Sequence, residues 1–154
     1  MDGISLADRA WPVLSLLMGA HARAYRLTCG LVGHRFPGLP PVLLLDHVGA
    51  RSGIRRTTPL AYITDGPDLV IVASKGGHPR HPAWFHNLRA NPATTVQVGT
   101  ARMPVHARTA TAAERERLWP RVVAAYAGYR AYQQRTHREI PLVILERGDR
   151  PARP

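Results

Sequence analysis

The chain has few of the residues on which many active sites depend. Cys29 is the only cysteine among 154 residues, so the chain can form no internal disulfide and no thiolate metal site. Aspartate and glutamate together number 10 and fall mostly in predicted turns and on predicted helix surfaces, which argues against hydrolysis by paired carboxylates. No apolar run is long enough to cross a bilayer. We therefore expect a cytoplasmic protein without a metal, in which a cofactor carries any difficult chemistry.

The charge that is abundant is positive. Lysine and arginine number 21, and the net charge of +11 indicates an anionic partner: nucleic acid, a membrane surface or a polyanionic small molecule. The arginines are scattered and accompany no motif that reads bases, so we do not expect nucleic acid. Lys75 is the only lysine, and it stands in a glycine-containing turn. A compact ammonium group there suits a phosphate or carboxylate in a tight space.

Hydrophobic periodicity predicts one α+β domain over residues 1–147, followed by a polar tail at 148–154. A helix is predicted over residues 6–28, within an N-terminal segment of residues 1–30, and Pro82 predicts a short helix over 83–89. Strands are predicted at 42–45, 57–64, 69–74, 94–98, 101–109 and 141–146. About six short antiparallel strands joined mainly by hairpin turns favour a small closed β-barrel with inserted helices.

Residues 111–132 combine a helix signal with a run of tyrosines. Thr111 and Glu114 form a capping box that opens a helix, and Pro120 is expected to kink or restart it. Tyr126, Tyr129 and Tyr132 follow at three-residue spacing, which on a helix places them roughly along one side. Such a stripe is either a packed aromatic face or a surface for a planar acceptor, with phenol groups that can donate a proton.

Two turns carry the residue types of an anion site. Residues 74–77 read Ser-Lys-Gly-Gly between a strand and a helix, where backbone N–H groups can approach an anion closely. Residues 51–56 carry three arginines and join the first two strands. Either turn alone can be an ordinary solvated loop, whereas the two together would give one barrel a local positive field.

Aromatic and histidine side chains follow the first of these turns. His78, His81 and His86 crowd a short span, but no acidic residue accompanies them, so we do not expect a zinc site. His81 is expected to cap the following helix or to contact a ligand. Trp84 either serves the core or stacks on a planar cofactor.

Several short motifs occur in a fixed order: Gly49-Ala50-Arg51-Ser52-Gly53, Thr58-Pro59-Leu60, Ala73-Ser74-Lys75-Gly76-Gly77, His81-Pro82-Ala83-Trp84-Phe85-His86-Asn87-Leu88 and Ala90-Asn91-Pro92. In this order they resemble the deazaflavin-dependent nitroreductase family of actinobacteria, which includes quinone reductases that use coenzyme F420. The resemblance extends over most of the chain, from about residue 42 to residue 146. It implies a split β-barrel related to flavin-binding oxidoreductases. It also implies hydride transfer from F420H2 to a quinone-like or nitroaromatic acceptor. The alternative function is a non-catalytic protein that binds F420, a flavin or an apolar ligand.

The resemblance also implies roles for particular residues. Around the coenzyme it places Arg51, Ser52, Arg56, Pro59, Ser74, Lys75, Gly76, Gly77, Trp84 and Asn87. The implied catalytic residues are Ser74, near the reacting ring, and Tyr126, Tyr129 and Tyr132, on the acceptor side. The chain departs from the family pattern at Ala50, where arginine is frequent. At Ala61 the best-known member has a tyrosine that lines the acceptor pocket, and in this chain Tyr62 is adjacent.

The N-terminal helix raises the question of a membrane. It carries apolar residues together with Arg9, Arg23 and Arg26, a combination that suits peripheral contact with an anionic leaflet. The alternative, which we favour, is that this helix packs on the barrel. The sequence leaves the oligomeric state open.

Overall fold

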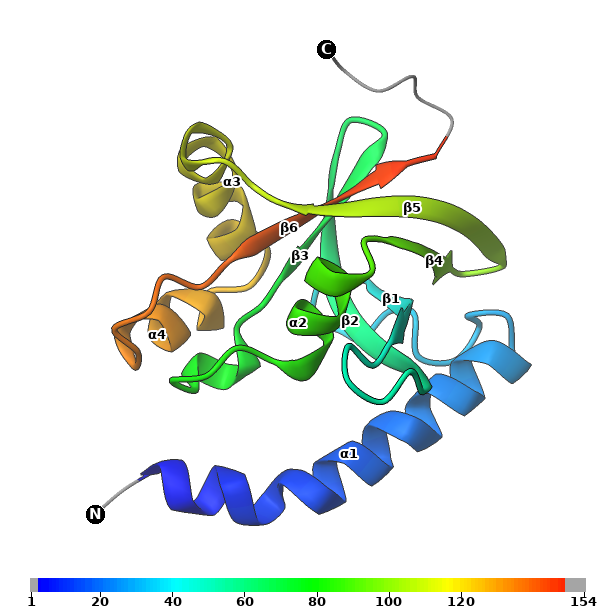
Figure 1. Cartoon of the computed structure of the whole chain (residues 1–154), viewed down its shortest axis with the longest axis horizontal. Helices are drawn as coiled ribbons and strands as arrows, with labels where there is room; N and C mark the ends of the chain where they lie inside the picture. The colour runs from blue at the N-terminus through cyan, green and yellow to red at the C-terminus, as the bar shows by residue number, and fades with distance from the viewer. Residues whose placement is uncertain (1–2, 149–154) are drawn as a thin grey trace.

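The computed structural model describes residues 3–148, including every side chain among them except those of residues 3–9 and 11. The predicted polar tail lies outside the described residues from position 149 onward, as does the side chain of Arg9. Within the described part, a β-barrel carries helices around it, and one long helix extends past its lower side in the view of Figure 1.

Six strands of the described residues close into one antiparallel barrel. They are β1 (Val42–Val48), β2 (Arg55–Asp65), β3 (Asp68–Val72), β4 (Ala93–Val98), β5 (Ala101–Thr109) and β6 (Leu142–Arg147). Their order around the barrel is β1-β2-β3-β6-β5-β4, and each neighbouring pair is antiparallel. The prediction of an α+β fold built on an antiparallel barrel of about six strands is therefore confirmed.

Strand β3 illustrates how the barrel uses both faces of a strand. Ile71 points inward and packs in the barrel core with Leu43, whereas Val70 and Val72 point outward and pack with Leu118 beneath the helices that follow β5. All five residues of β3 are buried. Because both faces are covered, the strand is a continuous apolar run from Leu69 to Val72 rather than an alternating one.

The helices in the described residues are α1 (Gly3–Leu27), α2 (Ala83–Ala90), α3 (Ala112–Ala125) and α4 (Gly128–Gln134), with a 3-10 turn η1 (Lys75–Gly77). The predicted capping box opens α3: Thr111 Oγ1 accepts the N–H of Glu114 at 3.3 Å, and the Glu114 carboxylate accepts the N–H of Thr111 at 2.8 Å. Of the kink or restart expected at Pro120, the restart does not occur: α3 runs through the proline as one helix. Leu118 and Val122 are buried on either side of it and offset the missing hydrogen bond. In the part that the structure describes, no helix combines the length and apolar character needed to cross a membrane.

Helix α1 packs on the barrel through its C-terminal half. Ala22 and Tyr25 are buried there, and the Tyr25 hydroxyl accepts the N–H of Gly99 at 2.7 Å. Arg26 forms an ion pair with Asp46 of β1. The packing alternative therefore holds for this half of the helix, while the residues before it extend away from the barrel (Figure 1).

Candidate functional site

The chain that leaves β3 enters a turn with an unusual backbone. The backbone of Ser74 is in the right-handed helical conformation, with φ −77°. Lys75, Gly76 and Gly77 follow in the left-handed conformation, with φ values of 45°, 63° and 81°. Left-handed backbone is costly for a residue with a Cβ, and Lys75 is one of two non-glycine residues in the described chain that adopt it. A right-handed residue followed by left-handed ones turns successive N–H groups toward one side, which makes a concave anion-binding surface.

Turn η1 lies directly against α4. Within the turn, the N–H of Gly77 donates to the carbonyl of Ser74 at 2.9 Å, and the N–H of His78 donates to the carbonyl of Lys75 at 3.1 Å. A Cβ on Gly77 would stand 2.5 Å from the carbonyl oxygen of Tyr132 in α4, so only glycine permits this approach. The turn and α4 are therefore in main-chain contact, and they are neighbours in Figure 1.

The three tyrosines lie together, but they do not line one side of a single helix as predicted. Tyr126 ends α3, and Tyr129 and Tyr132 belong to α4. Tyr126 lies with its ring centroid 5.3 Å from that of Tyr129 and 6.2 Å from that of Tyr132, and its hydroxyl is 3.4 Å from the Tyr132 hydroxyl. Burial raises the pKa of Tyr129 to about 12, and the hydrogen bond to Tyr126, followed by burial, raises the pKa of Tyr132. Tyr129 and Tyr132 therefore stay neutral phenols near pH 7.

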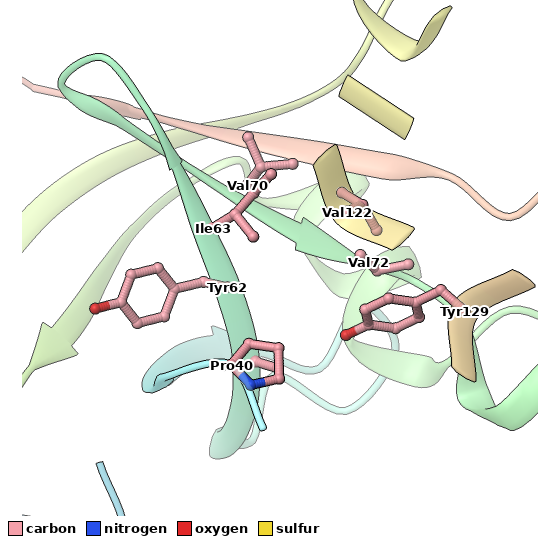
Figure 2. Close-up of a pocket in the computed structure, with 8 residues that line it drawn as sticks. Pro40, Tyr62, Ile63, Val70, Val72, Val122 and Tyr129 are labelled. Carbon is pink, nitrogen blue, oxygen red and sulfur yellow. The ribbon is translucent and has the colours of Figure 1, made fainter. Parts of the chain in front are cut away.

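An apolar depression opens beside Tyr129 (Figure 2). Tyr129 directs its ring toward the depression, whereas Tyr62 directs its ring away from it. The open space is about 10 Å³, roughly what one water molecule needs. In this conformation the depression therefore does not admit a planar ring. Its lining consists of Pro40, Ala61, Tyr62, Ile63, Val70, Val72, Val122 and Tyr129.

The second cationic turn joins β1 to β2 and is anchored by Asn87 of α2. The Asn87 side-chain oxygen accepts the N–H of Ala50 at 2.9 Å, and its amide nitrogen donates to Nδ1 of His47 at 2.9 Å. Nε2 of His47 then carries the ring proton and donates it to Oγ1 of Thr58 at 2.9 Å. Burial, followed by the charge of Arg56, lowers the pKa of His47, which favours this neutral ring. Asn87 is buried, and its hydrogen bond to the N–H of Ala50 holds the turn in place.

The other residues implied for the coenzyme are divided between surface and core. Arg51, Ser52 and Arg56 are exposed on and beside the β1–β2 turn, and Pro59 is half-buried in β2. Trp84 is buried in the core cluster inside the barrel. Its burial agrees with the core alternative, and stacking of Trp84 on a planar cofactor stays a prediction.

Sequence reasoning does not single out Arg138, which reaches η1 from the segment between α4 and β6. Its guanidinium donates to the carbonyl of Ser74 at 2.8 Å and lies 3.1 Å from Nδ1 of His81. Burial, followed by the charge of Arg138, lowers the pKa of His81, so a neutral ring faces the guanidinium. No local pattern distinguishes Arg138 from the many other arginines. Among residues 3–148, no group of three or more His, Cys, Asp and Glu side chains is arranged to hold a metal ion.

Comparison with known proteins identifies the family. The sequence profile of the F420H(2)-dependent quinone reductases matches residues 17–147. The chain belongs to the F420H(2)-dependent quinone reductase family. An F420H(2)-dependent quinone reductase of Mycobacterium tuberculosis (H37Rv) is 47% identical over 134 residues, which cover 85% of this chain and 90% of that protein.

Solved structures agree with this membership in the F420H(2)-dependent quinone reductase family. An F420-H2 dependent reductase, FDR-A, superposes with a TM-score of 0.64 at 42% identity, covering 69% of this chain and 94% of that one. A structure described as a domain-swapped dimer superposes with a TM-score of 0.65 at 37% identity, covering 82% of this chain and 96% of that one. This family member is an F420-dependent reductase with the split-barrel fold, and coenzyme F420 is its cofactor.

Proposed function

We propose that this F420-dependent enzyme transfers hydride from F420H2 to a quinone-like or nitroaromatic acceptor. We place the anionic part of the coenzyme at η1 and the acceptor beside the tyrosines of α3 and α4. The observation that carries the proposal is the contact between Gly77 and the carbonyl of Tyr132, because it sets these two regions side by side. Hydride transfer needs its two reactants held in close, fixed proximity.

The residues of the chain suit a coenzyme that carries a phosphate and a tail of glutamates. The concave backbone of residues 74–77 and the ammonium group of Lys75 suit a phosphate or carboxylate. Arg51 and Arg56, exposed near the second turn, add a positive field for a long anionic tail. Asn87 keeps that turn in place through the N–H of Ala50. The coenzyme supplies the hydride, while the protein binds, orients and shields the reactants.

Ser74, Tyr126 and Tyr132 are proposed to donate hydrogen bonds to the acceptor. Efficient proton transfer needs a donor whose pKa lies near the working pH, and the pKa of Tyr129, about 12, is far above it. Tyr129, which is buried, is therefore proposed to shape the acceptor side. Tyr132, whose pKa is also raised, is proposed to donate a hydrogen bond without releasing its proton. Because the depression beside it is small, the acceptor would lie over the partly exposed Tyr126 and Tyr132.

The small depression is also the observation that favours the alternative, a protein that binds F420 or a flavin without turnover. Reoxidation of F420H2 with menadione, and separately with a nitroaromatic, distinguishes the two functions. We expect turnover, with a raised KM for the acceptor in Tyr132→Phe and unchanged kinetics in Arg130→Gln, an exposed control on α4. Tight binding of F420 without turnover of either acceptor would refute the proposed reaction and support the binding protein. Parallel titration with flavin mononucleotide measures whether a flavin can replace F420.

For a peripheral membrane contact, we propose the apolar residues of α1 that lie away from the barrel. Val13, Leu16 and Leu17 are 62%, 75% and 60% exposed, and the exposed Arg23 suits an anionic leaflet. Deleting the helix would also remove the buried Tyr25, so the sharper test replaces Leu16 and Leu17 by glutamine. Flotation with phosphatidylglycerol vesicles should show binding that these changes abolish, and unchanged binding would contradict the proposal. One structural relative is described as a domain-swapped dimer, so light scattering on the same variants measures whether a second copy covers this face instead.

A further inference from the structure

The guanidinium of Arg138 is surrounded by the backbone next to the coenzyme turn. Nη2 donates to the carbonyls of Ala73 at 3.2 Å and Ser74 at 2.8 Å. Nε donates to the carbonyl of His78 at 2.9 Å, and Nη1 lies 3.1 Å from Nδ1 of His81. All three nitrogens of the group are engaged, with partners both before and after η1. A planar guanidinium matches such a spread of acceptors, whereas a lysine ammonium directs its donors from a single atom.

These contacts fix both ends of a turn that is costly to form. A left-handed lysine such as Lys75 persists only where its surroundings determine the conformation strongly. Ser74 and His78 flank the three left-handed residues, and Arg138 binds the carbonyls of both. In a trans peptide the N–H points opposite to the carbonyl of the same unit. Binding the carbonyls of Ala73 and Ser74 therefore directs the next N–H groups, those of Ser74 and Lys75, away from the guanidinium.

Arg138 is itself held by the helices that bear the tyrosines. Gln133 at the end of α4 donates from Nε2 to the carbonyl of Arg138 at 2.8 Å, and its Oε1 accepts the N–H of Ile140 at 2.9 Å. Arg115 of α3 donates to the carbonyl of Ile140 at 2.6 Å. A line of hydrogen bonds thus runs from α3 past the end of α4 to the coenzyme turn.

We propose that Arg138 is a positioning residue for the coenzyme, which acts by holding the backbone of residues 73–78 in its anion-binding shape. This inference rests on the proposed place of the coenzyme at η1. Arg138 acts through the turn and not by touching the coenzyme. The turn requires the fork of the guanidinium, meaning its planar set of N–H donors that point in several directions, and not its charge alone.

Three variants separate the fork from the charge. Arg138→Gln removes both, Arg138→Lys keeps the charge without the fork, and Arg130→Gln removes an exposed charge from α4. Hydrogen–deuterium exchange of residues 73–81 in the ligand-free protein reports the turn, and quenching of tryptophan fluorescence reports affinity for F420. We expect faster exchange and about tenfold weaker F420 binding in both Arg138 variants, as when about a tenth of the molecules keep a competent turn. The KM for F420H2 should rise while the KM for menadione stays unchanged.

Wild-type exchange in Arg138→Gln would overturn the inference, as would wild-type affinity in Arg138→Lys. An equal loss of affinity in Arg130→Gln would also overturn it, because bulk charge would then explain the effect. Faster exchange without loss of F420 affinity would mean that the shape of the turn does not serve the coenzyme, and would again overturn it. A wild-type protein that does not bind F420 would refute the proposed coenzyme site instead. If Arg138→Gln does not fold, Arg138→Lys still decides the inference, because it keeps the charge at that position.

Discussion

Replacing Gly77 by alanine tests whether η1 and α4 are in direct main-chain contact. A Cβ at this position would lie 2.5 Å from the carbonyl oxygen and 3.1 Å from the Cα of Tyr132, so backbone has to move. The φ value of 81° adds the strain of a left-handed alanine. Gly76 is a matched control, because its φ value is 63° but nothing lies within 4 Å of the place where a Cβ would stand.

The two contributions differ enough to be separated. A left-handed alanine costs about 1–2 kcal/mol, and both variants carry this cost. Displacing packed backbone adds about 1–3 kcal/mol, and only the variant at Gly77 carries this second cost. We therefore expect the free energy of unfolding to fall by about 1–2 kcal/mol in Gly76→Ala and by about 2–5 kcal/mol in Gly77→Ala.

Urea unfolding followed by tryptophan fluorescence measures this difference, provided that the m value is the same in both variants. F420 affinity is measured on the same samples under conditions in which both are folded. It should fall further in Gly77→Ala than in Gly76→Ala, because only the first displaces the turn from α4. Equal destabilisation by the two variants would refute the reasoning, since it would mean that η1 does not press on α4.

Three further predictions concern other contacts. Tyr25→Phe leaves the N–H of Gly99 without its acceptor and should lower the free energy of unfolding by about 1–3 kcal/mol, measured by urea unfolding; no loss would mean that α1 does not depend on this bond. Burial lowers the pKa values of His47 and His81 below 6.5, so the folded state binds fewer protons than the unfolded state. The stability present above pH 6.5 should therefore decline as the pH falls below it, and thermal unfolding at a series of pH values would contradict this if the midpoint stayed constant. Ala61→Tyr adds a phenol beside the depression and should change the KM for menadione while F420 affinity stays within about twofold, because Ala61 belongs to β2 and is not among the residues that hold η1; a parallel loss of F420 affinity would be the contrary result.

Local signals are enough to predict most of the barrel. The hairpin of β4 and β5 is marked by two runs of strand residues around Gly99, and the start of α3 by the capping box at Thr111. The prediction that the helix restarts at Pro120 was wrong. The rule that proline interrupts a helix is local, and it does not include the burial of Leu118 and Val122 on either side of the proline. Barrel closure joins strands that are far apart in the chain, and it followed from strand number and from resemblance rather than from any local pattern.

The contacts that hold the candidate site in place depend on closure of the barrel, and they were therefore not predicted from the sequence. Arg138 and Ser74 are 64 residues apart, but Val72 of β3 is in register with Leu142 of β6. In an antiparallel pair, the segment that leaves one strand lies beside the segment that enters the other, which brings Arg138 to the turn. The register of β3 and β6 was the missing signal. Asn87 was predicted as a coenzyme contact, but its partner His47 lies 40 residues away, so its role as an anchor of the turn could not be read locally.

The proposed coenzyme turn meets the proposed acceptor side through backbone atoms. Gly77 meets the carbonyl oxygen of Tyr132, and Arg138 binds carbonyls of the turn. Changing the ring of Tyr132 leaves that carbonyl in place, and changing Ala61 touches neither contact. Side chains on the proposed acceptor side, such as the one at position 61, can therefore be changed without altering these backbone contacts, and we expect such changes to leave F420 affinity in place. If F420 binds at η1 as proposed, we expect a substitution that alters the backbone at η1 or removes the guanidinium to act on coenzyme binding first, whichever acceptor is used.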